Sequence, residues 1–229
     1  MKIVLVPGLW LNGSSWASVT PLLERAGHTV TAVTLPGLES VDTPRAGITL
    51  ADHVSAVLAA TGDGPALLVG HSASATTVYL AADARPEAVA GLVYIGGFPG
   101  DDGSTFMGDM PVDGDDSPFP GWAAFEGPDS ADLSEAAKAE LLAEMVPTPS
   151  GVTTDTVVLR DERRRAIPAT VICPEFSPAD LTEWIDGGHL PELASATSLT
   201  LVDIDSGHWP QVTQPAALAA LILEAAERV

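Results

Sequence analysis

A buried-strand pattern runs directly into a tight turn and then into a helix pattern between residues 66 and 84. The apolar run Ala66–Val69 is followed by Gly-His-Ser-Ala-Ser at positions 70–74 and by an alanine-rich segment up to Ala84. A strand that folds at once into a helix needs small residues at the turn, where larger side chains would collide. Such a turn holds its central side chain clear of the backbone. The pattern therefore predicts a strand–turn–helix unit with Ser72 exposed as a candidate nucleophile.

A serine hydroxyl needs a neighbouring base to take its proton at neutral pH. The loop at residues 205–210, Asp-Ser-Gly-His-Trp-Pro, follows the last apolar strand pattern and precedes a helix that begins near Gln214. A histidine on such a loop can reach the serine of the turn, so we predict that His208 is the general base. We expect the other four histidines to be solvated or structural: His28, His53, His71 and His189.

A third element of the predicted site lies at the N-terminus. The apolar strand pattern Lys2–Val6 runs into Pro-Gly-Leu-Trp at positions 7–10. Gly8 allows this loop to pass close to the turn at Ser72. Fixed backbone N–H groups are the best donors to a developing oxyanion, so we predict that the N–H groups of Leu9 and Ala73 form an oxyanion hole.

Apolar runs alternate with helical patterns along most of the chain, which is typical of a mostly parallel sheet covered by helices on both faces. The length of 229 residues fits a single domain. The predicted strands are at about residues 2–6, 29–34, 66–70, 91–96, 169–173 and 198–203.

The chain resembles α/β-hydrolases, in particular the compact branch that contains plant methyl esterases and hydroxynitrile lyases. In that branch the first strand ends in His-Gly, the oxyanion residue follows, and a Trp closes the segment. Here Pro7, Gly8, Leu9 and Trp16 occupy these positions, with Pro7 as a departure, and Ser74 replaces the usual last glycine of the turn. The resemblance implies an α/β-hydrolase fold over nearly the whole chain and an acid between the serine and the histidine.

The position of that acid is less clear from the sequence. The predicted strand 169–173 leads into residues 174–180, where the resemblance places the acid, but the family's Asp aligns with Ser177. Glu175 is the nearest carboxylate and is our preferred candidate, since a directed Glu can orient the imidazole as an Asp does. The alternatives are Asp180, Asp101 or Asp102, or a serine–histidine pair without a usual acid.

The interval from about 98 to 165 breaks the alternation, and we predict that it is a small helical cap with a helix near 134–145. An insertion at this point of the fold lies at the carboxyl ends of the strands, where ligands bind. Aromatic residues there shape a pocket or pack the cap onto the body. We predict four substrate-binding residues: Trp10, Phe106, Trp122 and Trp209.

Charge and cysteine content exclude several classes of function. The net charge of −21, from 31 acidic and 10 basic residues, disfavours nucleic acid and anionic membranes as partners. The one cysteine, Cys173, is expected to be a packed thiol, and no zinc-ligand spacing is present. We expect the arginines at 160 and 163–165 to end a solvated helix. The chain starts directly with a strand pattern and shows no membrane span, so we expect a cytoplasmic protein.

These features together predict a serine hydrolase that cleaves a small or medium ester or lactone through an acyl-enzyme, without a cofactor or metal. One alternative is a lyase of the hydroxynitrile lyase type, which carries a lysine in this branch; Lys2 and Lys138 offer no obvious equivalent. The other is a non-catalytic small-molecule binding protein, because fold alone does not decide function. The sequence leaves the oligomeric state open.

Overall fold

All six predicted strands form, and they lie in one parallel sheet. The computed structural model describes residues 1–229. The strand order is β2-β1-β3-β4-β7-β8, and every neighbouring pair is parallel. The strands of this sheet are β1 (Lys2–Val6), β2 (Thr29–Ala32), β3 (Ala66–His71), β4 (Val89–Ile95), β7 (Ala169–Cys173) and β8 (Leu199–Asp203). The predicted α/β fold class is therefore confirmed, with β2 two residues shorter than expected and β4 beginning two residues earlier.

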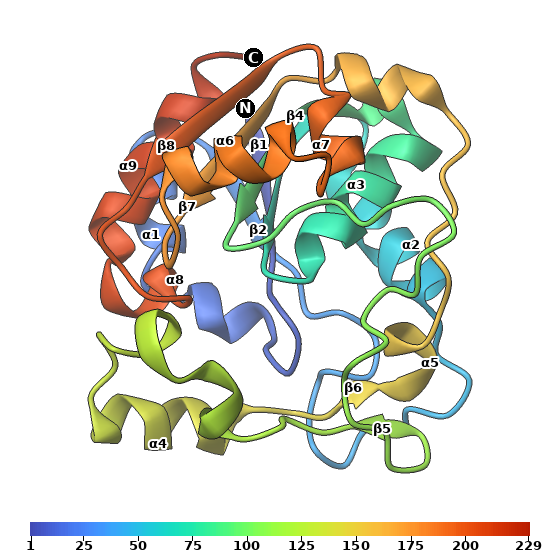
Figure 1. Cartoon of the computed structure of the whole chain (residues 1–229), viewed down its shortest axis with the longest axis vertical. Helices are drawn as coiled ribbons and strands as arrows, with labels where there is room; N and C mark the ends of the chain where they lie inside the picture. Colours follow the sequence, from blue (N-terminus) through green and yellow to red (C-terminus); the bar gives the residue numbers. More distant parts are fainter.

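Helices cover both faces of this sheet, and Figure 1 shows α1 and α9 on one side with α2 and α3 on the other. The helices of the body are α1 (Thr20–Arg25), α2 (Leu50–Thr61), α3 (Ser74–Ala84), α6 (Pro178–Asp186), α7 (Pro191–Ala194), α8 (Pro210–Thr213) and α9 (Pro215–Ala226). Two short 3-10 turns accompany them, η1 (Gly13–Trp16) and η2 (Pro86–Ala88). No helix is both long enough and apolar enough to cross a bilayer.

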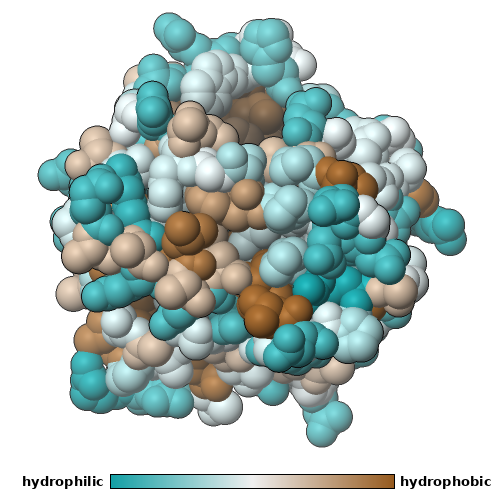
Figure 2. Space-filling view, turned by 90° about the horizontal axis from the view of Figure 1, so that it is seen from below, coloured by the Kyte–Doolittle hydropathy of each residue, from teal (hydrophilic) through white to brown (hydrophobic).

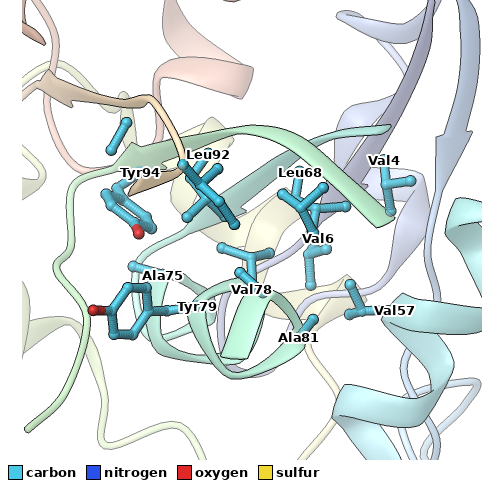
Figure 3. Packing of buried hydrophobic residues seen from close by; sticks show 14 of the residues in the cluster. Val4, Val6, Val57, Leu68, Ala75, Val78, Tyr79, Ala81, Leu92 and Tyr94 are labelled. Atoms are coloured by element: carbon cyan, nitrogen blue, oxygen red, sulfur yellow. The ribbon is translucent and has the colours of Figure 1, made fainter. Parts of the chain in front are cut away.

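The two helical layers bury alternate side chains of the same strands, since successive residues of a strand point to opposite faces. Val4 and Leu68 join one cluster, which includes residues of α2, α3, α6 and α7. Ile3 and Leu67 join the other cluster, with residues of α1 and α9. Figure 3 shows the first layer, in which Val78 on α3 packs beneath the strand residues. This double coverage explains why the strands appear in the sequence as continuous apolar runs.

The chain between β4 and β7 is irregular and contains the predicted helix near 134–145. Its elements are β5 (Asp116–Ser117), η3 (Trp122–Phe125), η4 (Gly127–Asp129), α4 (Glu135–Glu144), β6 (Thr148–Pro149), α5 (Ser150–Thr153) and η5 (Glu162–Ala166). Ser134 begins α4 as its N-cap, where its side chain accepts from the Ala137 N–H. In Figure 1, α4, β5 and β6 lie at the end of the molecule opposite the chain termini.

The expected solvated helix end at residues 163–165 is wrong for Arg164. Its side chain is 2% exposed and forms ion pairs with Asp83 at 3.2 Å and Glu192 at 2.9 Å. A buried guanidinium requires such partners, because a lone buried charge is strongly destabilising. Arg164 thus belongs to the interior, whereas Arg160 and Arg163 are exposed as expected. The expectation for Cys173 is confirmed, since its thiol is buried and burial raises its pKa to about 12.

Candidate active site

The turn after β3 holds Ser72 in a strained backbone conformation. Ser72 has φ 55°, in the left-handed region that favours glycine, and its N–H donates to the Ile95 carbonyl at 2.8 Å. The turn leaves no room for side chains nearby, because a Cβ on Gly70 would collide with the Ser74 carbonyl and a Cβ on Gly97 with the backbone of Ser72. These contacts fix the direction of the Ser72 side chain.

Ser74, the departure from the usual last glycine, has a contact of its own. Its buried hydroxyl donates to the Pro7 carbonyl at 2.5 Å. This bond joins the start of α3 to the loop after β1. A Cβ on Gly8 would stand 3.2 Å from Ser72 Cβ and 2.7 Å from His71 Nδ1, so that loop passes directly against the turn.

Ser72, His208 and Glu175 lie in one hydrogen-bonded line. His208 Nε2 is 2.9 Å from Ser72 Oγ, and His208 Nδ1 is 2.7 Å from Glu175 Oε1. The three residues follow β3, β8 and β7, whose carboxyl ends meet at the same edge of the sheet. The Glu175 carboxylate can only accept at Nδ1, so the neutral imidazole presents a lone pair at Nε2 to the serine hydroxyl. The serine hydroxyl thus has a base within hydrogen-bond distance.

The alternative acids contact other groups. Asp180 forms a capping box with Ser177, the N-cap of α6, and accepts both its N–H and its hydroxyl. Asp102 accepts the Leu159 N–H at 2.8 Å, and Asp101 is exposed. Of the four candidate carboxylates, Glu175 is the one that the structure places on His208.

Ala73 directly follows Ser72, and Leu9 follows Gly8 in the loop that passes against the turn. Neither backbone N–H donates to an acceptor within the protein, and both residues pack against the same small apolar cluster. Two free N–H groups from the loop after β1 and from the residue after a nucleophile are the arrangement that can hold an oxyanion.

His71 is buried behind this line and contacts the backbone of His208. Its Nε2 is 2.7 Å from the His208 carbonyl, and its Nδ1 is 3.4 Å from Gln211 Nε2. The carbonyl can only accept, so His71 carries its proton on Nε2. Burial, followed by the nearby His208, lowers the pKa of His71 to about 3. We expected His71 to be solvated or structural, and it is buried; its place directly before Ser72 is the one feature of the sequence that points to this contact.

We expect the buried neutral His71 to make stability depend on pH. Its native pKa of about 3 lies below the ordinary 6.5, so the unfolded chain binds more protons between these values. Its contribution to the free energy of unfolding is complete above pH 6.5 and declines as the pH falls toward 3. Between about pH 7 and pH 5 the loss is roughly 2 kcal/mol.

Urea unfolding of wild type and His71→Gln at both pH values measures this contribution. His53 and His28 also have pKa values lowered by burial, but they remain in both proteins. The change in the free energy of unfolding between pH 7 and pH 5 therefore differs between the two proteins by the contribution of His71. An equal change in the free energy of unfolding in both proteins would show that His71 is not held neutral in the native state.

An open cavity of about 410 Å³ lies beside Ser72, and Phe106, one of the four residues expected to bind substrate, is among the residues that line it. The cavity is also lined by side chains to which the sequence analysis gave no role in binding, among them Phe98, Met107, His189 and Leu190. No lysine or arginine lines the cavity. We expected His189 to be solvated or structural; it is exposed, at the rim of this cavity.

The three tryptophans predicted to bind substrate do not line this cavity. Trp10 and Trp209 are 5% and 3% exposed, and they pack with Trp122 and neighbouring apolar residues in one cluster beside His208. The Trp10 indole N–H donates to the Ser117 carbonyl at 3.0 Å. The rings of Trp10 and Trp209 are thus covered by the segment between β4 and β7, and the contact of these tryptophans with substrate stays a prediction.

Figure 2 shows the end of the molecule at which these segments lie, seen from below Figure 1. Hydrophilic and intermediate residues cover most of this face, and hydrophobic residues appear in separate patches, one of them in a recess. The apolar side chains of this end are thus mostly turned inward.

A family model described as the alpha/beta hydrolase family matches residues 3–221. A pyrethroid hydrolase from Sphingobium wenxiniae is 31% identical over 96 residues, which are 41% of this chain and 34% of that protein. Methylesterase 7 from Arabidopsis thaliana is 35% identical over 106 residues, 42% of this chain and 40% of that protein. These matches cover well under two thirds of either relative.

The solved structures agree with this chain over almost its whole length. An extracellular alpha/beta-hydrolase from a Paenibacillus species superposes with a TM-score of 0.79 and 18% identity, over 98% of each chain. At this identity the likeness concerns the fold.

Proposed function

The chain belongs to the alpha/beta hydrolase family, and on this premise we propose that it is a serine hydrolase that cleaves a small or medium carboxylic ester or lactone through an acyl-enzyme. The observation that carries the proposal is the line from Ser72 through His208 to Glu175, with contacts of 2.9 and 2.7 Å. A serine held in a strained turn and bonded to an oriented imidazole is an arrangement suited to nucleophilic catalysis.

In the first half of the reaction, His208 Nε2 takes the proton of Ser72 Oγ while that oxygen attacks the carbonyl carbon of the substrate. The carbonyl π electrons move to its oxygen, and the N–H groups of Leu9 and Ala73 stabilise this oxyanion. The tetrahedral intermediate then expels the alcohol oxygen, which takes the proton from His208. Glu175 stabilises the imidazolium that exists between these two transfers.

In the second half, a water molecule gives a proton to His208 and attacks the acyl carbon. Collapse of the second tetrahedral intermediate breaks the bond to Ser72 Oγ, which recovers its proton from His208, and the carboxylic acid leaves. Every proton in the cycle passes through His208, so the sequence of steps requires no group beyond the side chains and N–H groups already named.

We further propose that residues 98–165 form the cap of a single domain and that Phe106 contacts the substrate. The cavity beside Ser72 is within the size range of small-molecule sites, about 300–1,000 Å³. Phe98 and Phe106 offer apolar contacts in this cavity, and the presence of Asp101 without a lysine or arginine disfavours an anionic substrate. The relatives named as a methylesterase and a pyrethroid hydrolase support an ester of this kind.

A panel of small esters and lactones, matched amides and a hydroxynitrile tests the proposal. We expect release of acid and alcohol from at least one ester or lactone, and no cyanide from the hydroxynitrile. Cyanide release with no ester cleavage would favour the lyase instead. A protein that binds panel compounds without converting any of them would be a binding protein and would contradict the proposal.

A further inference from the structure

The loop that carries His208 is held by backbone contacts from the segment between β4 and β7. The His208 N–H donates to the Asp129 carbonyl at 2.8 Å. The preceding N–H, of Gly207, donates to Asp132 Oδ2 at 2.8 Å. Two successive peptide groups of the loop are therefore fixed by one short stretch of chain that is distant in sequence.

The same carboxylate accepts a second bond, because the Ser206 hydroxyl lies 3.1 Å from Asp132 Oδ2. Asp132 and Asp129 approach the backbone of residue 207 so closely that this position requires glycine. A Cβ there would collide with Asp132 Oδ1 and would stand 2.5 Å from the Asp129 carbonyl oxygen. Asp132 thus bonds the two residues that directly precede His208.

The carbonyl of His208 is also held by a hydrogen bond. It accepts from His71 Nε2 at 2.7 Å, so both polar groups of the residue's backbone are bonded to distant parts of the chain. With its backbone fixed, the imidazole can keep both the contact to Ser72 and the contact to Glu175. Small displacements of a catalytic group have large effects on rate, which makes this support relevant to the chemistry.

The segment that provides Asp132 is anchored independently of that side chain. Leu133, the next residue, is 6% exposed and packs in the cluster that contains Trp10 and Trp209. Ser130 is also buried, whereas the Asp132 side chain itself is exposed. Removing the Asp132 carboxylate should therefore release the loop while leaving the segment packed.

We propose that Asp132 is a positioning residue for His208, and that the segment between β4 and β7 orients the base in addition to covering the cavity. This inference rests on the proposed function of His208 in proton transfer. Asp132 acts through the Gly207 and Ser206 contacts and touches neither substrate nor imidazole.

The test compares Asp132→Ala and Asp132→Asn with Asp109→Ala, an exposed aspartate of the same segment with no side-chain bond. We expect Asp132→Ala to lower kcat about 10-fold with KM within about two-fold, as the loss of a hydrogen bond that orients the base would. Asp132→Asn keeps an acceptor oxygen and should restore most of kcat. Asp109→Ala should match wild type in kcat and KM, and the melting temperature of all three variants should lie within about 6 °C of wild type, because at most two hydrogen bonds are lost.

Amide hydrogen exchange at Gly207 and His208 provides a readout that does not need turnover. We expect faster exchange at both amides in Asp132→Ala alone. Unchanged kcat and unchanged exchange in that variant would overturn the inference, as would a loss of kcat that Asp109→Ala shares. A wild-type protein that converts no ester would overturn the proposed function instead, and the exchange rates would still decide whether Asp132 holds His208.

Discussion

Replacement of Ser72 with alanine is expected to abolish ester hydrolysis, with kcat lowered about a million-fold, as the loss of a serine nucleophile does in other hydrolases. Alanine keeps the Cβ and so should preserve the strained turn, while it removes the one oxygen that lies 2.9 Å from His208 Nε2. Without that oxygen no acyl-enzyme forms. Steady-state rates on the preferred ester measure the effect.

Ser104→Ala is the matched control for this prediction. Ser104 lines the same cavity, and its hydroxyl donates to the Asp101 carbonyl at 2.7 Å, away from His208. We expect this variant to keep kcat within about two-fold of wild type, as a substitution outside the reacting groups does. Hydrolysis by Ser72→Ala at the wild-type rate would exclude Ser72 as the nucleophile.

Replacement of Glu175 with glutamine is expected to lower kcat about ten-thousand-fold, comparable with loss of the acid in other triads. The amide has nearly the shape of the carboxylate, but it carries no charge to stabilise the imidazolium, and its NH₂ group can bond the wrong imidazole tautomer. Asp180→Asn and Asp102→Asn serve as controls, since neither carboxylate contacts His208. Kinetics on one ester across the three variants measures the difference.

Asp129 offers an informative contrast to Glu175. Burial, and then the nearby charge of Glu175, raise the pKa of its carboxyl, so Asp129 is a second acidic group close to Glu175. If Glu175→Gln kept full activity while Asp129→Asn lost it, the acid would belong to the segment between β4 and β7. That outcome would contradict the assignment of Glu175.

The sheet could be predicted from the sequence because the strands have helices on both faces. A strand such as β3, buried along its whole length, has to be apolar throughout, and such runs are visible without knowledge of the partners. The ends of β2 and β4 were less certain, because the last pairs of a strand depend on the length of its neighbours in the sheet.

The candidates Ser72 and His208 could be named because a tight turn and a loop after the last strand have local signatures. Glu175 was one of several carboxylates, since the path of residues 174–177 beyond β7 decides which of them reaches the imidazole. The structure places Glu175 in contact with His208, and its catalytic role stays a prediction.

Residues whose place depends on distant parts of the chain could not be assigned from the sequence. Trp10 and Trp209 are aromatic residues near the site, but whether a ring lines a cavity or packs inside depends on what covers it. Arg164 is buried because Asp83 and Glu192 approach from α3 and α7. The contacts of Asp132 and His71 with the loop of His208 likewise join segments far apart in the sequence.

The central claim is that Ser72 is an activated nucleophile, and covalent labelling tests it most directly. Wild type and Ser72→Ala would each be incubated with a fluorophosphonate, and the intact mass and the labelled peptide would be determined. We predict one phosphonyl group on wild type, located on Ser72, and none on Ser72→Ala. Labelling of both proteins to the same extent, or of a wild-type residue other than Ser72, would contradict the claim.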